Sequence, residues 1–359
     1  MANDNNSGGD DWSLFPYEPV KAAPIVFAVF LTVIGVYQIY QSFWKYHWKK
    51  FGGIMTWATT VWISGFITRA ISVHQPHGIN IFIAQFVLIL MGPPLYAAAE
   101  YFILGRLMSY LPYHTVIHPG RVISTFVILS VIVESLTANG AANSAGEGRT
   151  PAQVETGLAC LKAALIVQSV IEVFYLTLVG SVEWKCRKAR CFPRNVRVVC
   201  YTLYITSTMM LVRCIVRTIE GFEAAACRAN PAGPPGHCGE VSTHEAYLWV
   251  FEIANITLFV VILALFHPGK YLPRDSRIFL DPIDGKTERV GPGYSKADKR
   301  PMLATILDPF NLFGIVTGKG MAIQPFWNEH QPIYDGGEVK EDKRGERGQS
   351  AEAVESGSP

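Results

Sequence analysis

The chain has 359 residues, of which 50% are hydrophobic and 17% are charged, and its formal net charge at pH 7 is +2. Soluble globular proteins carry about 25% charged residues, so this composition excludes a typical soluble protein and indicates a membrane protein whose charges lie in loops and a tail. The nearly balanced net charge identifies no partner, and we expect no nucleic-acid partner.

Seven apolar runs are each long enough to cross about 30 Å of hydrocarbon as a helix. They predict an all-α, polytopic membrane protein with a seven-helix transmembrane domain over residues 24–269, an N-terminal segment over 1–23 and a tail over 270–359. In the third run, Gly92-Pro93-Pro94 predicts a kink that either faces a cavity or only serves packing. The runs are Pro24–Phe43, Ile54–Val73, Ile79–Leu104, Arg121–Gly140, Gly157–Val182, Val198–Gly221 and Ala246–Phe266.

Basic residues in the short loops predict the orientation. The loops after the first, third and fifth runs contain eleven Lys and Arg residues, against three on the opposite side. We therefore expect an extracellular N-terminus and a cytosolic tail. Residues 1–21 have no basic segment before the first apolar run, which disfavours a cleaved signal peptide.

Two features on the predicted outer side fit this orientation. Asn5-Asn6-Ser7 is a glycosylation sequon at Asn5. Cys227 and Cys238 share the loop after the sixth run, where a disulfide would persist; the alternative is two unpaired thiols. The seven cysteines form no CxxC and no Cys/His pattern with metal spacing, so we expect neither a metal site nor a cofactor.

The tail after Lys270 is rich in Pro and Gly and mixed in charge, so we expect little structure there. Met302–Met321 is apolar but broken by polar residues and Gly, which makes it a candidate interfacial helix rather than an eighth span. Gly336–Pro359 is charged and rich in small residues, and we expect it to be disordered.

Ionisable residues inside the apolar runs are the main indication of function. A charged residue at the centre of a lipid-facing helix raises the free energy of membrane insertion by about 2.5–3.5 kcal/mol. Counting rise along each helix places one group in the outer half of the membrane, where it predicts a polar, substrate-binding chamber. Lys162 falls at the same depth, and snorkelling is the simpler explanation for Lys162 and Glu220. The chamber residues are Arg69, Glu134, Arg213, Arg217, Glu220 and Glu252.

Spacing along the sixth run adds detail. Arg213, Arg217 and Glu220 share one helix face, and the last two are close enough to pair, so a purely structural ion pair is the alternative. Glu100 and Glu172 fall in the inner half, where they predict a gate or inner polar site. For Glu100, pairing with Arg106 is the other interpretation.

Several of these residues occur in motifs that resemble those of the fungal lipid-translocating exporter family, over about Tyr17–Leu272. Where that family usually has aspartate in its fourth and seventh spans, this chain has Glu134 and Glu252. The motifs are Tyr17-Glu18-Pro19, Gly65–Arg69, Pro94–Tyr101 with Gly105-Arg106, Gln168, Arg213 with Arg217–Glu220, and Glu245 with Glu252 and His267-Pro268-Gly269.

The resemblance implies a multi-pass plasma-membrane protein that moves an amphipathic lipid, such as a sphingoid base, sterol-like lipid or phospholipid, or that confers resistance to toxic lipids. Gly314–Gly320 has the wrong spacing for a phosphate-binding loop, so we expect no ATP hydrolysis. Membrane lipids are the expected partners.

Seven spans with an outside N-terminus are also the topology of a lipid sensor or receptor, which is the main alternative, although fold analogy alone carries little functional weight. An intramembrane hydrolase would need several histidines at one depth to hold a metal, and the nine histidines are dispersed. We therefore expect no enzyme and no catalytic residues.

Overall fold

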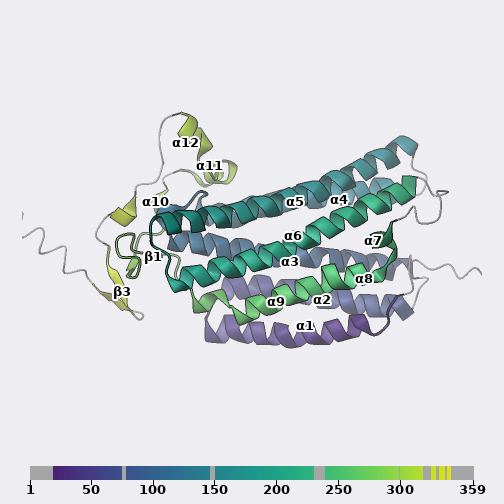
Figure 1. Cartoon of the computed structure of the whole chain (residues 1–359), viewed down its shortest axis with the longest axis horizontal. Helices are drawn as coiled ribbons and strands as arrows, with labels where there is room; N and C mark the ends of the chain where they lie inside the picture. The colour runs from purple at the N-terminus through teal and green to yellow at the C-terminus, as the bar shows by residue number, and fades with distance from the viewer. Residues whose placement is uncertain are drawn as a thin grey trace, which may run out of the picture.

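The computed structural model describes residues 19–74, 78–145, 150–229, 239–298, 300–317, 325–328, 331–335 and 338–340. Most of them are helical, and the long helices lie side by side along one axis (Figure 1). Asn5 and Cys238, for which glycosylation and a disulfide are predicted, lie outside the described residues.

The described part of the chain forms a bundle of seven long helical segments. Two of them contain a π-helix, in which the backbone hydrogen bonds span five residues instead of four. The segments are α1 (Ala23–Ile39) continued by the π-helix η1 (Tyr40–Lys45), α2 (Lys49–His74), α3 (Ile79–Tyr110), α4 (Val122–Ala145), α5 (Pro151–Lys188), α6 (Arg194–Ala229), and α8 (Glu245–Tyr247) continued by the π-helix η4 (Leu248–Ala254) and α9 (Asn255–Leu265), with the short α7 (Glu240–Thr243) before α8.

Among the described residues, six helices are long and apolar enough to cross a membrane, so the chain is a multi-pass membrane protein. The helix α2 occupies the place of the predicted second span but is not among the six, because Arg69 and its many hydroxyl residues lower its hydropathy. The six are Ala23–Lys45, Asn80–Tyr110, Pro119–Gly140, Pro151–Lys188, Arg194–Cys227 and Glu245–Lys270.

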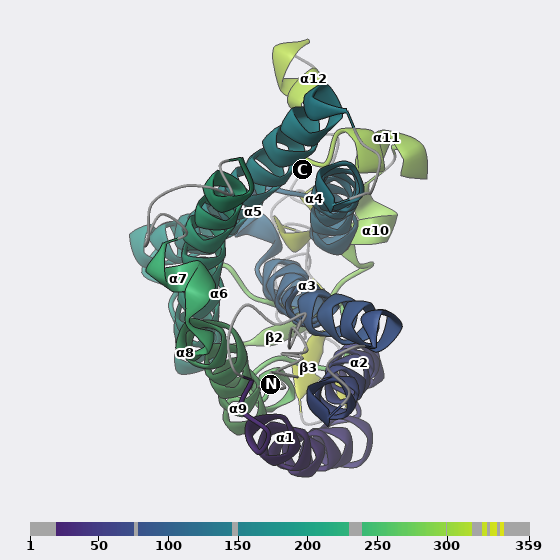
Figure 2. The same cartoon turned by 90° about the vertical axis from the view of Figure 1, so that its right-hand side faces the viewer.

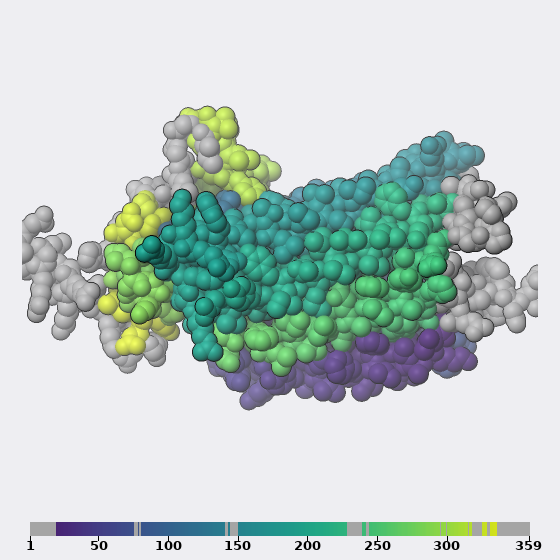
Figure 3. All heavy atoms as spheres, in the orientation of Figure 1, coloured from purple at the N-terminus to yellow at the C-terminus, as the bar shows by residue number. Residues whose placement is uncertain are grey.

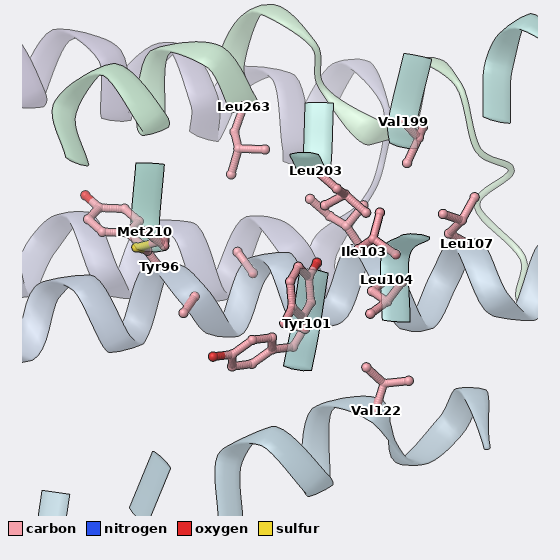
Figure 4. Close-up of a cluster of buried hydrophobic side chains, with 14 of the residues drawn as sticks. Tyr96, Tyr101, Ile103, Leu104, Leu107, Val122, Val199, Leu203, Met210 and Leu263 are labelled. Carbon is pink, nitrogen blue, oxygen red and sulfur yellow. The ribbon is translucent and has the colours of Figure 1, made fainter. Parts of the chain in front are cut away.

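The bundle has a packed interior and an apolar exterior. Aromatic and aliphatic side chains from α3, α4, α6 and α9 meet in the core, including Tyr96, Leu104, Val122, Leu203 and Leu263 (Figure 4). Many large apolar side chains are exposed on the outer faces of the long helices. Figure 3 shows the surface that these helices form. An exposed apolar surface of this extent is expected where a helix bundle meets lipid.

The predicted kink in α3 does not interrupt the helix. Proline has no N–H, so Pro93 leaves the carbonyl of Ile89 without its helical donor, and Trp62 Nε1 of α2 donates to that carbonyl at 3.2 Å. Gly92 allows this contact, because a Cβ atom there would lie 2.3 Å from the Trp62 ring. The proline pair thus ties α3 to α2, and Pro93 and Pro94 also line an interior cavity.

Two His-Pro-Gly sequences form the same turn. At His118-Pro119-Gly120, before α4, and at His267-Pro268-Gly269, after α9, the imidazole Nδ1 accepts a hydrogen bond from the glycine N–H at 3.1 Å. In both cases the proline begins a short 3₁₀ helix, as its fixed φ favours. His267 Nε2 also lies 3.0 Å from Ser42 Oγ in η1, which joins the end of the seventh segment to the first.

The tail differs from the sequence-based expectation of little structure. It forms an antiparallel sheet in the order β1-β2-β3-β4, with Ile278 opposite Val290, Glu288 opposite Tyr334 and Tyr334 opposite Val339. The strands are β1 (Ile278–Leu280), β2 (Glu288–Val290), β3 (Ile333–Asp335) and β4 (Glu338–Lys340), and the short helices of the tail are α10 (Tyr294–Ala297), α11 (Met302–Leu307) and α12 (Leu312–Val316).

The prediction failed because strands of three residues carry no readable periodicity, and the segment is ordered by contacts with the bundle. Arg106 of α3 donates to the carbonyls of Pro273 and Arg274 at 2.7 and 2.9 Å, and Tyr110 donates to Glu288 at 2.9 Å. We call the end of the bundle that carries this sheet the sheet end, and the opposite end the distal end (Figure 1).

The predicted interfacial helix is divided into α11 and α12. They lie beside the sheet end (Figure 1), and Arg121 Nε, directly before α4, donates to the buried Thr305 Oγ1 at 2.9 Å. Leu303, Leu307 and Phe313 on these helices are exposed. The part of Gly336–Pro359 that the structure describes is the strand β4, so the expectation of disorder is wrong for Glu338–Lys340.

Candidate functional site

A buried ion network joins α6 to the seventh helical segment. Arg213 donates to Glu252 Oε1 through Nε at 3.0 Å and Nη2 at 2.8 Å, and the two side chains are 3% and 5% exposed. Arg217, one turn along α6, lies 3.7 Å from Glu252 Oε2 and donates to Glu220 at 2.7 Å. Alternating charges therefore compensate one another inside the bundle, and the predicted pairing of Arg217 with Glu220 is confirmed.

The position of Glu252 depends on the π-helix η4, which the sequence did not predict. A π-turn inserts one extra residue into a helix, changes the direction of the following side chains, and often occurs at functional sites. Just after it, Asn255 Nδ2 donates to the carbonyl of Met209 in α6 at 2.7 Å. A second contact thus joins the two helices on the sheet-end side of the Arg213–Glu252 pair.

Arg213 also lines an interior cavity between α3, α4, α5 and α6. The same cavity is lined by Glu134, Gln168 and Glu172, so it gathers polar groups from three helices. Its volume is about 20 Å³, enough for roughly one water molecule. In this conformation the cavity, which polar and apolar side chains line together, is too small for a lipid head group.

Arg69 belongs to a second buried pair. Its Nη2 lies 2.6 Å from Glu245 Oε1, its Nη1 donates to Gln85 at 3.3 Å, and its guanidinium lies 5.5 Å from the ring centre of Trp249. The backbone N–H of Val20 donates to the other Glu245 oxygen at 2.8 Å. The structure therefore places Arg69 at the distal end with Glu245, and not among the residues that line the cavity.

Glu245 is a member of this ion network that is not among the predicted site residues. The signal was available, because Glu245 and Glu252 are seven residues apart and so lie about two turns apart on one helix face. Both acids of the seventh segment bind an arginine, one from α2 and one from α6. The sequence predicted one polar chamber, whereas the structure has two ion clusters, Arg69–Glu245 and Arg213–Glu252, which share the seventh helical segment. Glu134 lines the cavity beside the second cluster.

Glu100 and Glu172 lie closer to the sheet end. Glu100 is 0% and Glu172 4% exposed, and one carboxylate oxygen of each has no hydrogen-bond partner among the described residues. Ser207 Oγ donates weakly to Glu100 at 3.4 Å. The alternative pairing of Glu100 with Arg106 is wrong, because Arg106 binds the tail carbonyls and lies over Trp48.

The remaining predicted positions lie near the distal end. The ammonium of Lys162 lies 5.3 Å from the ring centre of Phe222 on α6. Cys227, in the last turns of α6, is disulfide-bonded, while the partner predicted for it, Cys238, lies outside the described residues, so that pairing stays a prediction. Among the described residues, no group of three or more His, Cys, Asp or Glu side chains is arranged to hold a metal ion.

Comparisons with known proteins cover most of the bundle. The profile of the family described as RTA1 like protein matches residues 55–275, which include both ion clusters. A lipid-translocating exporter-like protein RTA1 of Leptosphaeria maculans is 26% identical over 314 residues, 85% of this chain and 59% of that protein, so the chain spans less than two thirds of that relative. No solved structure gives a significant match.

Two further relatives are shorter matches. A lipid-translocating exporter-like protein RTA1 of Ajellomyces capsulatus is 30% identical over 239 residues, 63% of this chain and 70% of that protein. Protoporphyrin uptake protein 1 of Saccharomyces cerevisiae is 28% identical over 207 residues, 56% of this chain and 63% of that protein. The resemblance found in the motifs is confirmed, and the chain belongs to the RTA1-like protein family.

Proposed function

We propose that this protein moves an amphipathic lipid across the plasma membrane without ATP hydrolysis, and so protects the cell from toxic lipids. Relatives named as lipid-translocating exporter-like proteins support a family role in lipid export or resistance. The observation that carries the proposal is the Arg213–Glu252–Arg217 network beside a polar cavity within an apolar bundle. A head group crossing a bilayer needs such a polar route, while its tail can stay in lipid.

The proposed topology has seven spans, with the distal end outside. The helix α2 has 26 residues, about 39 Å of helix, and lies between α1 and α3 (Figure 2). Pairing with Glu245 reduces the cost of carrying Arg69 through the membrane. With seven spans, the tail sheet lies on the same side of the membrane as the loops that contain most of the basic residues. The positive-inside rule assigns that side to the cytosol.

The cavity must open for a head group to pass. Arginine can bind phosphate and glutamate can bind an amine, so the substrate head group would replace one partner in an existing ion pair instead of meeting an uncompensated charge. Two irregular elements offer places for helix movement: the proline pair of α3, which lines the cavity, and the π-helix η4, whose Glu252 binds the cavity residue Arg213.

Liposomes containing the purified protein test the proposal. Leaflet exchange of a labelled sphingoid base, phospholipid and sterol should be fast with the wild-type protein and lost with Arg213→Gln or Glu252→Gln. The matched control is Arg187→Gln, which changes an exposed arginine paired with Glu183 on the same bundle. Exchange that survives both substitutions, or wild-type protein that exchanges none of the three lipids, contradicts the proposal.

The second candidate is a seven-helix lipid sensor. The observation that favours it is the folded tail, which binds the sheet end of α3 through Arg106 and Tyr110 and would move with that helix. A sensor would show lipid-dependent change in the exposure of the tail without leaflet exchange. Hydrogen exchange of residues 273–298 with and without added lipid separates the two functions.

A further inference from the structure

The tail helices α11 and α12, which we call the helix pair (residues 302–316), expose an apolar surface that the lipid-translocation proposal does not use. Single exposed apolar side chains are common in proteins, but a group of them on one short segment indicates a binding surface. Six large apolar side chains of the helix pair are at least 60% exposed: Met302, Leu303 and Leu307 of α11, and Leu312, Phe313 and Val316 of α12.

Polar groups between α11 and α12 are bonded within the tail. The Asp308 carboxylate accepts from the backbone N–H groups of Leu312 at 2.8 Å and Phe313 at 2.9 Å, at the start of α12. Arg300 Nη1 donates to the carbonyl of Asp308 and to Asn311 Oδ1, both at 3.1 Å. A segment that satisfies its polar groups internally and turns apolar side chains outward is suited to contact with lipid.

Two hydrogen bonds fix the depth of the helix pair along the bundle. The backbone N–H of His118 donates to the carbonyl of Pro309 at 2.9 Å, and Arg121 Nε donates to Thr305 Oγ1 at the same distance. His118 directly precedes the apolar span Pro119–Gly140, and Arg121 is among its first residues. The helix pair therefore lies at the level where α4 enters the membrane.

Phe310, between α11 and α12, reaches further into the bundle. Its ring centre lies 5.9 Å from that of Phe174 on α5. Phe174 is eight residues before the end of the apolar run Gly157–Val182, which is about 12 Å along the helix. The link between the two short helices thus packs against a part of α5 that lies at the level of the hydrocarbon.

The helix pair lies at the side of the bundle. In Figure 1, α11 and α12 are alongside α5, whereas β1 and β3 lie beyond the ends of the long helices. Figure 2 places them outside α4 and α5, at the periphery. Val173, which precedes Phe174 on α5, is itself exposed. Because lipid surrounds the sides of a membrane-spanning bundle, the exposed side chains of the helix pair continue its lipid-facing surface.

Other residues mark the sheet end as a lipid–water boundary. Trp44, in η1, and Trp184, near the end of α5, are exposed, and Lys188 Nζ lies 5.3 Å from the ring centre of Trp184. Arg190 and Arg194, in and after the turn that follows α5, are also exposed. Tryptophan and basic residues gather where a membrane protein leaves the hydrocarbon, so the helix pair shares its end of the bundle with an interfacial belt.

We propose that the helix pair is a membrane anchor of the tail. The helices α11 and α12 lie in the lipid–water interface at the sheet end, with their exposed apolar side chains among the acyl chains of that leaflet. The partner is the phospholipid bilayer itself, so the anchor does not depend on which lipid the protein moves. The tail is then held at the membrane surface twice, by Arg106 of α3 and by the helix pair.

Fluorescence quenching of the full-length protein in phosphatidylcholine nanodiscs tests the anchor directly. An environment-sensitive fluorescent amino acid replaces Leu307 or Phe313, or, as the control, Lys286, which is exposed between β1 and β2. A phospholipid with a nitroxide near the head-group end of its acyl chain should quench the probe at positions 307 and 313 but not at 286. Dissolved iodide should quench the probe at 286 but not at 307 or 313.

A serine variant separates membrane anchoring from folding of the tail. In nanodiscs, Leu303→Ser with Leu307→Ser and Phe313→Ser should speed amide hydrogen exchange of residues 302–316 at least about tenfold, because three large side chains lose their burial in lipid. Exchange in β1 and β2 should stay the same, which shows that the sheet is intact. The matched control is Ile283→Ser, which changes an even more exposed apolar side chain outside the helix pair and should leave residues 302–316 unaffected.

Two results would overturn the anchor. Iodide quenching at positions 307 and 313 as strong as at 286 would mean that water surrounds the helix pair. Protection from iodide without quenching by the nitroxide lipid would mean that protein covers it, either another segment of this chain or a second copy. A failure of lipid exchange in liposomes contradicts the proposed function alone, because the quenching and exchange measurements use no transported lipid.

Discussion

Two sets of buried acids in one bundle have different partners. Glu245 and Glu252, in the distal half, each bind an arginine at less than 3 Å. Glu100 and Glu172, nearer the sheet end, are equally buried, but each has a carboxylate oxygen without a hydrogen-bond partner among the described residues. Because an unpaired buried carboxylate is costly, we infer that the first pair of acids is ionised and the second is protonated.

The comparison shows where each kind of chemistry is available. The ionised acids are already neutralised by arginines, so they can exchange partners with a charged head group. The carboxyl groups of Glu100 and Glu172 are within electrostatic reach of each other. Ser207 Oγ donates to the Glu100 carboxyl group, and the Tyr175 hydroxyl donates to the backbone carbonyl of Glu100. Only Glu172 of this pair also lines the cavity with Arg213, so it is the acid that links the two regions.

The largest expected effect comes from breaking the ionised pair. Arg213→Gln leaves Glu252 without its closest partner, and loss of one member of a buried ion pair costs about 3–5 kcal/mol. The double variant Arg213→Leu with Glu252→Leu removes both charges and should recover much of that loss. Thermal unfolding of the detergent-solubilised variants measures both, and a single variant as stable as the wild type would mean that the network is not desolvated.

Acidification should weaken the sheet end next. Burial lowers the pKa of His118 from its ordinary value of 6.5 to about 4, despite the nearby Asp298 carboxylate at 3.4 Å. Between pH 6.5 and 4 the unfolded segment binds more protons than the folded one, so its stability falls as the pH is lowered through this window and the loss is complete below about 4.

Hydrogen exchange of residues 294–312 over that pH range measures the effect. These residues include Arg300, which binds Asp298 and the carbonyl of Asp308, and Pro309, whose carbonyl accepts from the His118 N–H. His118→Asn should flatten the pH dependence because it removes the titrating ring. A dependence that is unchanged by His118→Asn would assign the titration to another group.

A smaller effect is expected at the unpaired acids. If Glu172 and Glu100 are protonated, then Glu172→Gln or Glu100→Gln replaces a neutral carboxyl by an amide of similar shape and should change stability by less than about 1 kcal/mol. The carbonyl stretch of a protonated carboxylic acid in the infrared spectrum should be lost in the same variants. A loss of stability as large as that of Glu252→Gln would remove the distinction between the two sets of acids.

The smallest effect is expected at the surface. Arg187→Gln breaks a pair with Glu183 whose arginine is largely exposed, and such pairs contribute about 0.3–0.5 kcal/mol. This variant is therefore the baseline for the other measurements. A shift in unfolding temperature comparable to that of Arg213→Gln would indicate that detergent, and not burial, determines the ranking.

Local patterns in the sequence predicted the helices and part of the site. Hydrophobic runs gave the positions of all seven long segments, and i, i+3 spacing gave the Arg217–Glu220 pair. What they could not give depends on contacts between distant residues. The Arg69–Glu245 pair spans 176 positions, and the π-helix η4 has no known signature in composition. The tail sheet likewise depends on contacts between its strands and with α3.

The carbonyl of Ile89, which has no donor within its own helix, limits how the first three helices can move relative to one another. Because its donor is the indole of Trp62 on the neighbouring helix, a rotation of α3 about its proline pair must either carry α2 with it or break this bond. A change of shape around the inner cavity would thus be transmitted mechanically to α2, and through the packing of α2 against α1 to the edge of the bundle.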